Sequence, residues 1–196
     1  DDISPIIELS KIKGLDLRSN LIIDIAPLSH LNTLVLLDLD YNQIVDISSL
    51  VELNNLTGLA LKENQIVDIT SLAGLSELKG LDLESNQIES ISSLSALTEL
   101  TVLELDSNKI SDISSLSGLN KLTALDVGNN QIDDIVPLSG LANLSGLSIA
   151  DTLVMSLAPL FELDNLKWLD ISRTLVNPKK NPSHLEQIQD LEAKGV

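Results

Sequence analysis

The sequence contains no cysteine and very few aromatic residues, and each absence narrows the possible folds. Disulfides commonly close the ends of secreted eukaryotic repeat proteins of this size, so their absence favours a bacterial or an intracellular setting. Aromatic residues make up 2% of the 196 residues, so the core must be built from leucine, isoleucine and valine. A repeating chain with one narrow interior permits such a core.

Basic residues are also scarce. The chain has 12 lysines and arginines against 29 acidic residues, a formal net charge of −17. Phosphates would be repelled, so we expect neither nucleic acid nor an anionic membrane as partner, whereas a basic protein or bound cations are allowed. No apolar run approaches the length of a transmembrane helix, so membrane insertion is not expected.

What the chain does contain is a period of 22 residues. Around each repeated asparagine the leucines and isoleucines keep the same offsets, and the asparagines are Asn20, Asn42, Asn64, Asn86, Asn108 and Asn130. A fixed period in this range indicates a solenoid, in which each repeat packs only on its neighbours.

Each unit carries a Leu-x-Leu pair whose period of two indicates a short strand. Successive copies would pair as parallel strands about 4.8 Å apart. We expect eight such strands, around residues 14–18, 36–40, 58–62, 80–84, 102–106, 124–128, 146–150 and 168–172. On the return side the apolar residues come at spacings of three, as in Ile47, Leu50 and Leu53, which predicts 3₁₀ turns and extended segments.

The repeated polar residues have structural interpretations. A stacked column of asparagines can satisfy the backbone groups that the turn after each strand buries. One aspartate per unit is expected to accept a hydrogen bond from a backbone N–H two or three residues further on, with Ser90 in this place in one unit. These aspartates are Asp24, Asp46, Asp68, Asp112 and Asp134. A calcium ladder along them is a less favoured alternative, because calcium prefers a denser loop of ligands.

This pattern resembles the leucine-rich repeat over residues 2 to about 176. Its 22-residue form, Asn-x-Ile-x-Asp-Ile-x-Pro/Ser-Leu, resembles the repeat of the internalins, a family of bacterial surface proteins. The leucine-rich regulatory subunit of a eukaryotic protein phosphatase is similar in period. The resemblance implies an α/β-type solenoid, a right-handed superhelix whose eight parallel strands line a concave face used for protein binding.

The pattern changes near the C-terminus. Repeats are expected in residues 1–176, with an incomplete first unit, and a capping segment in residues 177–196. In the last two units Thr152 and Thr174 replace the asparagine, which predicts looser turns because a hydroxyl makes fewer hydrogen bonds than an amide.

The capping segment has the sequence of a short helix. Ser183 and Glu186 have the spacing of a capping box, and Gly195 stands where a helix would end. A helix over residues 183–194 is therefore predicted as a lid over the last repeat. The first unit has no such lid, so we expect an open apolar edge there, with further sequence upstream or self-association at this edge.

Outward positions of the predicted strands form columns on the concave face. One column is small or apolar and the next is acidic in six of eight units. Carboxylates stacked at strand spacing repel each other by roughly 0.2–1 kcal/mol per pair. They either keep the exposed sheet soluble or recruit a basic partner. The candidate partner-binding residues are Asp16, Asp38, Asp40, Tyr41, Asp82, Glu84, Glu104, Asp106, Asp126, Trp168, Asp170 and Arg173.

Protein interfaces usually carry aromatic or arginine anchors near their centre. Tyr41 and Trp168 are six strands apart, about 29 Å at the strand spacing, so they cannot form one hot spot. We expect Trp168 to be the anchor, beside Asp170 and Arg173. Packing of Trp168 against the end of the solenoid is the alternative.

No enzyme active site is predicted. His30 and His184 are far apart in the repeat pattern, and no phosphate-binding loop or His/Cys metal spacing occurs. Paired carboxylates such as Asp38 and Asp40 are expected to be exposed, without the desolvation that acid–base catalysis needs. No cofactor and no metal ion are expected.

The sequence therefore predicts a non-catalytic domain that binds a protein partner through its concave face, secreted by or on the surface of a bacterium. One alternative is a scaffold or regulatory segment of a larger intracellular signalling protein, which would lie in the cytoplasm. Another is a structural or adhesive element that acts through bound cations.

Overall fold

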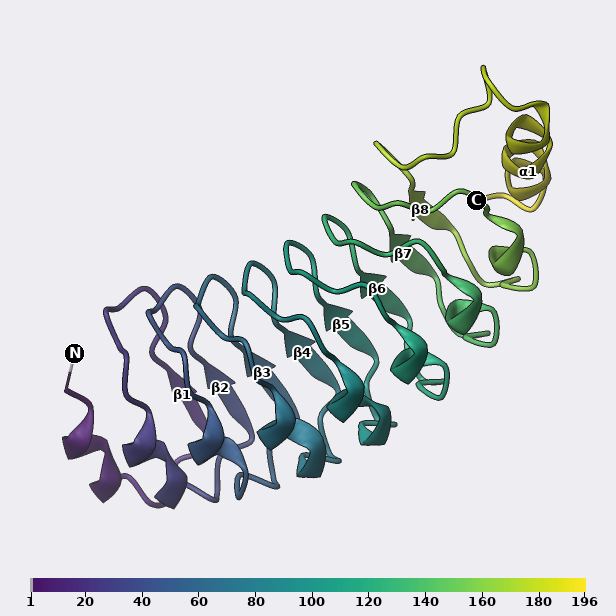
Figure 1. Ribbon diagram of the computed structural model, residues 1–196. Helices are drawn as coiled ribbons and strands as arrows, with labels where there is room; N and C mark the ends of the chain where they lie inside the picture. The colour runs from purple at the N-terminus through teal and green to yellow at the C-terminus, as the bar shows by residue number, and fades with distance from the viewer. Residues whose placement is uncertain (1) are drawn as a thin grey trace.

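The computed structural model describes residues 2–196, so Asp1, the first residue of the predicted repeat region, lies outside the described residues. The chain winds into a curved solenoid whose first described residues and C-terminus lie at opposite ends of the arc (Figure 1). Its strands form one parallel sheet in sequence order: β1 (Gly14–Asp16), β2 (Leu36–Asp38), β3 (Gly58–Ala60), β4 (Gly80–Asp82), β5 (Val102–Glu104), β6 (Ala124–Asp126), β7 (Gly146–Ser148) and β8 (Trp168–Asp170). These strands line the concave face, as predicted.

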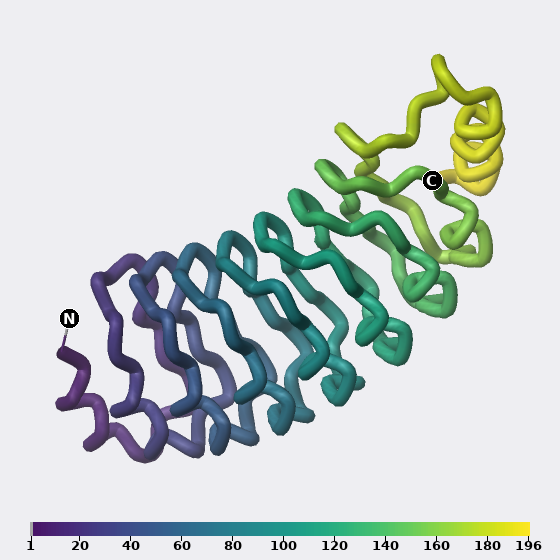
Figure 2. Tube along the Cα trace, in the orientation of Figure 1, coloured from purple at the N-terminus to yellow at the C-terminus, as the bar shows by residue number. Residues whose placement is uncertain are grey.

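The strand register follows the 22-residue period without a slip. Gly14 pairs with Leu36, Leu36 with Gly58, and Gly58 with Gly80, so equivalent positions stack in columns across the sheet. Figure 2 shows the resulting coils, which share nearly the same outline over most of the arc. No helix among residues 2–196 is both long and apolar enough to cross a membrane.

Each strand has three residues, shorter than the five expected. Hydrogen bonds between neighbouring coils continue past the strand, since the Leu17 N–H donates to the Asp38 carbonyl at 2.8 Å. The chain then turns at a residue with positive φ, at Ser19, Tyr41, Glu63, Ser85, Ser107, Asn129, Asp151 and Arg173. This left-handed conformation costs a residue other than glycine roughly 1–2 kcal/mol. It occurs three residues after the end of every strand, and no glycine in the sequence marked it.

The return side of the solenoid is built from short 3₁₀ helices, as predicted. They are η1 (Ser4–Glu8), η2 (Ala26–His30), η3 (Ser48–Leu50), η4 (Thr70–Gly74), η5 (Ser92–Ala96), η6 (Ser114–Leu116), η7 (Val136–Leu138) and η8 (Ala158–Leu160). The preceding aspartate accepts from a backbone N–H two residues on, for example Asp68 from Thr70 at 2.8 Å. Ser90 instead donates weakly to the Ser92 hydroxyl at 3.3 Å.

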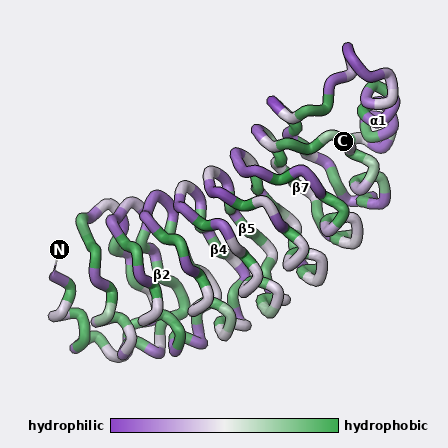
Figure 3. Tube along the Cα trace, viewed as in Figure 1, coloured by the Kyte–Doolittle hydropathy of each residue, from purple (hydrophilic) through white to green (hydrophobic). Residues whose placement is uncertain are grey.

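The core is a continuous column of leucine, isoleucine and valine. Its members from Ile22 to Leu166 are at most 3% exposed. Figure 3 shows hydrophobic stretches recurring from coil to coil along the solenoid. In the first described coil Ile6, Ile12 and Leu15 are only partly buried against this core. Self-association at this edge stays a prediction.

The asparagine column lies inside the turns that follow the strands. The Asn86 side-chain amide donates to the carbonyls of Leu61, Leu83 and Glu84 at 2.9–3.2 Å, and its Oδ1 accepts from the Ile66 N–H at 2.9 Å. Each asparagine from Asn42 to Asn130 thereby joins its own coil to the preceding one. Asn20 is exposed, and its amide donates only within its own turn, to Leu17 and Arg18.

Threonine replaces this arrangement in the last two coils. The Thr152 hydroxyl donates to the Ile149 carbonyl at 2.6 Å, and the Thr174 hydroxyl to the Ile171 carbonyl at 2.8 Å. Both contacts stay within one turn. These side chains therefore do not reach the preceding coil as the asparagines do.

The C-terminal helix α1 (Pro182–Ala193) closes the last coils, and its Leu191 and His184 are buried. The Gln187 side chain accepts from the Leu157 N–H at 3.0 Å, which ties the helix to the repeats. The predicted capping box at Ser183 is wrong. Asn181 caps the helix by accepting from the Ser183 N–H, because Pro182 occupies the first helical position, where its missing N–H is not needed. Gly195, with φ 87°, ends the helix as expected.

Candidate functional site

A groove of about 650 Å³ lies on the concave face over strands β1 to β5. Its lining combines the small or apolar column with the acidic column beside it. The outward residues that line it are Gly14, Asp16, Leu36, Asp38, Gly58, Ala60, Gly80, Asp82, Val102 and Glu104. The sequence pattern predicted these columns, but the groove itself arises from their alignment across the sheet.

The apolar side of the groove contains a hollow between two exposed aliphatic side chains. Leu36 is 57% exposed and Val102 is 39% exposed. The Leu36 side chain leans over Gly58, where an added Cβ would come within 2.8 Å of Leu36 Cδ2. An added Cβ at Gly80 would meet nothing within 4 Å. The hollow is therefore open at Gly80.

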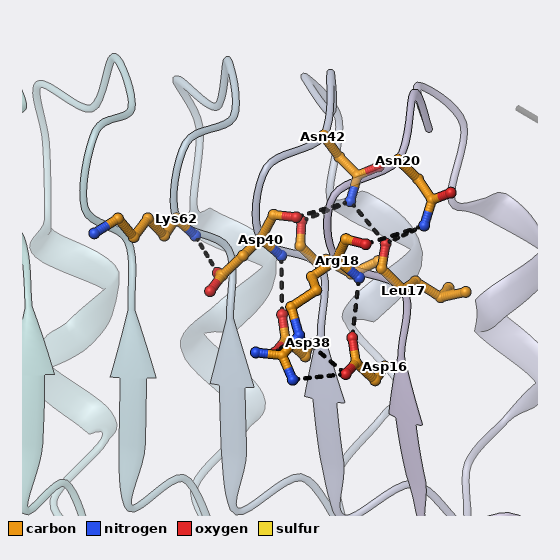
Figure 4. A network of polar contacts seen from close by, with 9 residues as sticks. Asp16, Leu17, Arg18, Asn20, Asp38, Asp40, Asn42 and Lys62 are labelled. Atoms are coloured by element: carbon orange, nitrogen blue, oxygen red, sulfur yellow. Dashed lines mark hydrogen bonds and ion pairs between the residues drawn. The ribbon is translucent and has the colours of Figure 1, made fainter.

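The acidic side of the groove is neutralised within the chain near β1 and β2 (Figure 4). The Arg18 guanidinium donates to Asp16 Oδ2 at 2.8 Å and lies 3.6 Å from Asp38 Oδ2. These contacts lower the pKa of Asp16, chiefly through its hydrogen bond with Arg18. Arg18 therefore offsets the charge of the first two aspartates of the column.

Lys62 plays the corresponding part near β3 and β4. Its Nζ lies 2.7 Å from Glu84 Oε2 and 6.0 Å from the centroid of the Tyr41 ring. The hydrogen bond with Glu84 raises the pKa of Lys62. The Lys62 backbone N–H also donates to Asp40 Oδ1 at 2.7 Å. One lysine therefore serves two carboxylates through two different groups.

No such compensation occurs near β5 and β6. Within residues 2–196, no lysine or arginine forms an ion pair with Glu104, Asp106 or Asp126. Asp126 accepts from the Gly128 N–H at 2.8 Å, and Asp106 from the Ser107 hydroxyl at 2.6 Å. The carboxylate of Glu104 takes part in none of the hydrogen bonds among the described residues.

The expectation that the paired carboxylates of the concave face, such as Asp38 and Asp40, are exposed is wrong. Stacking at strand spacing covers each side chain with its neighbours, so Asp40, Asp82, Glu104 and Asp126 are all partly buried. Burial, followed by repulsion from Asp126 and Asp82, raises the pKa of Glu104 to about 7. Burial likewise raises the pKa of Asp40 to about 6, and it raises the pKa values of Asp82 and Asp126.

Part of the acidic column has a structural role in the turn. Asp38 and Asp82 accept from the backbone N–H two residues further on, at 3.1 and 2.9 Å, and Asp16, Asp126 and Asp170 do the same. Such contacts favour aspartate before a tight turn. They do not account for Glu104, which makes no such contact. Glu104 is thus the acidic residue that the fold explains least.

The aromatic candidates lie apart from each other and differ in surroundings. Trp168 on β8 is 56% exposed and lies outside the groove, with its ring beside Gly146. Arg173 forms its ion pair with Asp151, while Asp170 accepts from the Ser172 N–H at 2.8 Å. Tyr41 is 48% exposed and has Lys62 near its ring. The structure therefore does not join Trp168, Asp170 and Arg173 in one contact network.

The histidines are on separate elements, as expected. His30 is an exposed residue of η2, whereas the buried His184 of α1 accepts from the Asn177 N–H at 2.8 Å. In residues 2–196 no three histidine or acidic side chains are grouped so that they could hold a metal ion.

Comparison with known proteins gives consistent results. Family models described as "Leucine rich repeat" and "Leucine Rich repeats (2 copies)" match residues 56–110 and 98–143. An internalin C2 structure from Listeria monocytogenes has 38% identity and a TM-score of 0.83, with 85% of this chain and 74% of that chain covered. The chain belongs to the internalin-like leucine-rich repeat proteins.

A second internalin structure, inlF from the same organism, has 33% identity and a TM-score of 0.84. That alignment covers 85% of this internalin-like chain but 49% of the inlF chain, so the chain spans about half the length of that relative. No curated protein matches the chain. Leucine-rich repeat folds of this kind serve protein–protein interaction in general.

Proposed function

We propose that this chain is a non-catalytic domain that binds a protein partner through its concave face. The observation that carries the proposal is a cluster of three carboxylates, Glu104, Asp106 and Asp126, whose charge no lysine or arginine offsets and which lies beside an open apolar groove. Holding like charges together in a partly buried position costs stability. A partner that supplies positive charge and apolar surface would recover that cost.

Several other features agree with this proposal. An open groove lined by aliphatic side chains and carboxylates suits macromolecular recognition. The described residues contain no cluster of side chains that could hold a metal ion. The charge of −17 favours a basic protein surface and disfavours nucleic acid as partner. Trp168, exposed at the far end of the sheet, would provide a second contact for a large partner. We further propose that the chain is secreted by a bacterium or lies on its surface, and its likeness to the Listeria internalins supports this proposal.

Site-specific photocrosslinking tests the proposal. A photoreactive amino acid replaces Ala60 in the groove or, as matched control, Ser95 on the return side, and both proteins are irradiated in cell extracts. We expect discrete protein adducts from position 60 that position 95 does not give. An excess of wild-type chain should suppress them, and a chain with Asp82→Asn, Glu104→Gln and Asp126→Asn should not.

The same experiment has outcomes that contradict the proposal. Identical adducts from both positions would show contact without a preferred face. The absence of any adduct from position 60 in extracts that yield adducts elsewhere on the chain would mean that the concave face is not the binding surface.

A further inference from the structure

The groove has an apolar part and a charged part that are displaced from one another. Gly80 on β4 pairs with Val102 on β5, and Glu104 lies two residues further along β5. At usual strand spacings, the open position at Gly80 is about 8 Å from Glu104 and about 12 Å from Asp126. A ligand that filled both parts would therefore carry an apolar group and a positive group about 8–12 Å apart.

An extended protein segment meets this requirement. In an extended chain, side chains two residues apart point to the same side and are separated by about 6.4–6.8 Å. The stem of a lysine or arginine adds the remaining reach. An aliphatic residue and a basic residue two positions apart would thus reach both parts from one backbone.

We propose that the groove binds an extended protein segment in which an aliphatic side chain enters the hollow at Gly80 and a nearby lysine or arginine pairs with Glu104 and Asp126. This inference rests on the proposed function and specifies the partner's chemistry. The aliphatic side chain would lie between Leu36 and Val102, which bound the hollow. The positive charge would go where the chain provides none, since Arg18 and Lys62 serve the carboxylates nearer β1 to β4.

Two other occupants are less well suited. A second copy of this chain carries the same charge of −17, so its approach would be repelled. A small cation would find no grouped ligand set among residues 2–196 and would leave the apolar hollow empty. A segment with both chemistries uses the whole groove.

The structure offers a matched pair of substitutions for the test. Gly80→Val places side-chain atoms in the hollow, where an added Cβ meets nothing within 4 Å. Gly146→Val adds the same side chain to the same column on β7, outside the groove, where the nearest atom is 3.9 Å away. Valine suits strands, so both variants should fold. Glu104→Gln, with Glu77→Gln at an exposed glutamate outside the groove as its control, tests the charge in the same way.

The probes are fluorescein-labelled 12-residue peptides of glycine and serine that carry Leu-Ser-Arg, Ser-Ser-Arg or Leu-Ser-Gln. Binding is measured by fluorescence anisotropy at pH 8 and low ionic strength. We expect the Leu-Ser-Arg peptide to bind wild type at least about tenfold more tightly than either of the others. Gly80→Val should weaken its binding about tenfold and Glu104→Gln about fivefold, and both controls should change it less than about twofold.

Equal binding of the Leu-Ser-Arg and Ser-Ser-Arg peptides would overturn the inference, because it would show attraction by charge alone. Equal effects of Gly80→Val and Gly146→Val would overturn it as well, as would full displacement of the peptide by an equal concentration of spermidine. Absence of all peptide binding, together with specific crosslinks at position 60, would refute the segment proposal and leave the concave-face function standing. Absence of both would refute the two together.

Discussion

Glu104→Gln should stabilise the protein at alkaline pH and leave it unchanged near pH 4.5. Glu104 is partly buried, makes no hydrogen bond among the described residues, and faces Asp82, Glu84, Asp106 and Asp126 without a cation. Glutamine has nearly the same shape and removes the charge. The change therefore tests whether repulsion between carboxylates on the concave face lowers the free energy of unfolding.

The magnitude follows from the pKa of Glu104, which rises from its usual 4.5 to about 7 in the folded chain. Each pKa unit corresponds to about 1.4 kcal/mol, so a fully buried group would lose about 3 kcal/mol on ionisation. Because the side chain is only partly buried, solvent screening reduces this to about 1–2 kcal/mol. A raised carboxylate pKa contributes stability that is complete below pH 4.5 and is lost as the pH rises through 7.

Urea denaturation followed by circular dichroism at pH 4.5 and pH 8.5 measures this effect. We expect the variant and wild type to have the same free energy of unfolding at pH 4.5. At pH 8.5 the free energy of unfolding of the variant should be about 1–2 kcal/mol higher than that of wild type. Glu77→Gln, at an exposed glutamate outside the concave face, should change stability by less than about 0.5 kcal/mol at both pH values. An equal gain at both pH values, or a loss at pH 8.5, would refute the electrostatic reasoning.

Three further changes test the fold, each measured by the same denaturation assay. Asn86→Ala should lower the free energy of unfolding by about 3 kcal/mol or more, because it leaves buried backbone groups of two coils without partners. Asn20→Ala should lower it by less than about 1 kcal/mol, and equal losses would contradict the proposed role of the asparagine column. Ser90→Asp should add about 0.5–1 kcal/mol by accepting from the Ser92 N–H, and no gain would argue against the capping role. Glu63→Asn should add about 0.5–1 kcal/mol, since asparagine tolerates the φ of 53° better, and a loss would show that the glutamate side chain is needed.

The order and register of the coils were predictable because the repeat is strictly local. A leucine at the same offset in each 22-residue unit can be buried only if the units stack in register, and Leu37, Leu59 and Leu81 do pair across the sheet. The helical lid followed from local spacing too. The Ser183–Glu186 spacing indicated the wrong cap, because Pro182 takes the first helical position and Asn181 therefore becomes the cap.

Two local features had no signal in the sequence. The left-handed residue after each strand varies from serine to tyrosine to arginine, so no residue type marked it. The hydrogen bonds that each turn forms with the neighbouring coils impose this left-handed conformation. The strands were likewise shorter than their Leu-x-Leu pattern predicted, although hydrogen bonds between neighbouring coils continue past them.

The sequence alone determined which side chains would share a column, because the period fixes their neighbours. Only the tertiary structure decided how those neighbours interact, since charge compensation and burial depend on distances across strands. Arg18 and Lys62 reach the acidic residues near β1 to β4, whereas Glu104 is left without a partner beside the open hollow at Gly80. A one-dimensional pattern specifies contacts in order, but the free energy of a partly buried charge is set by everything packed around it.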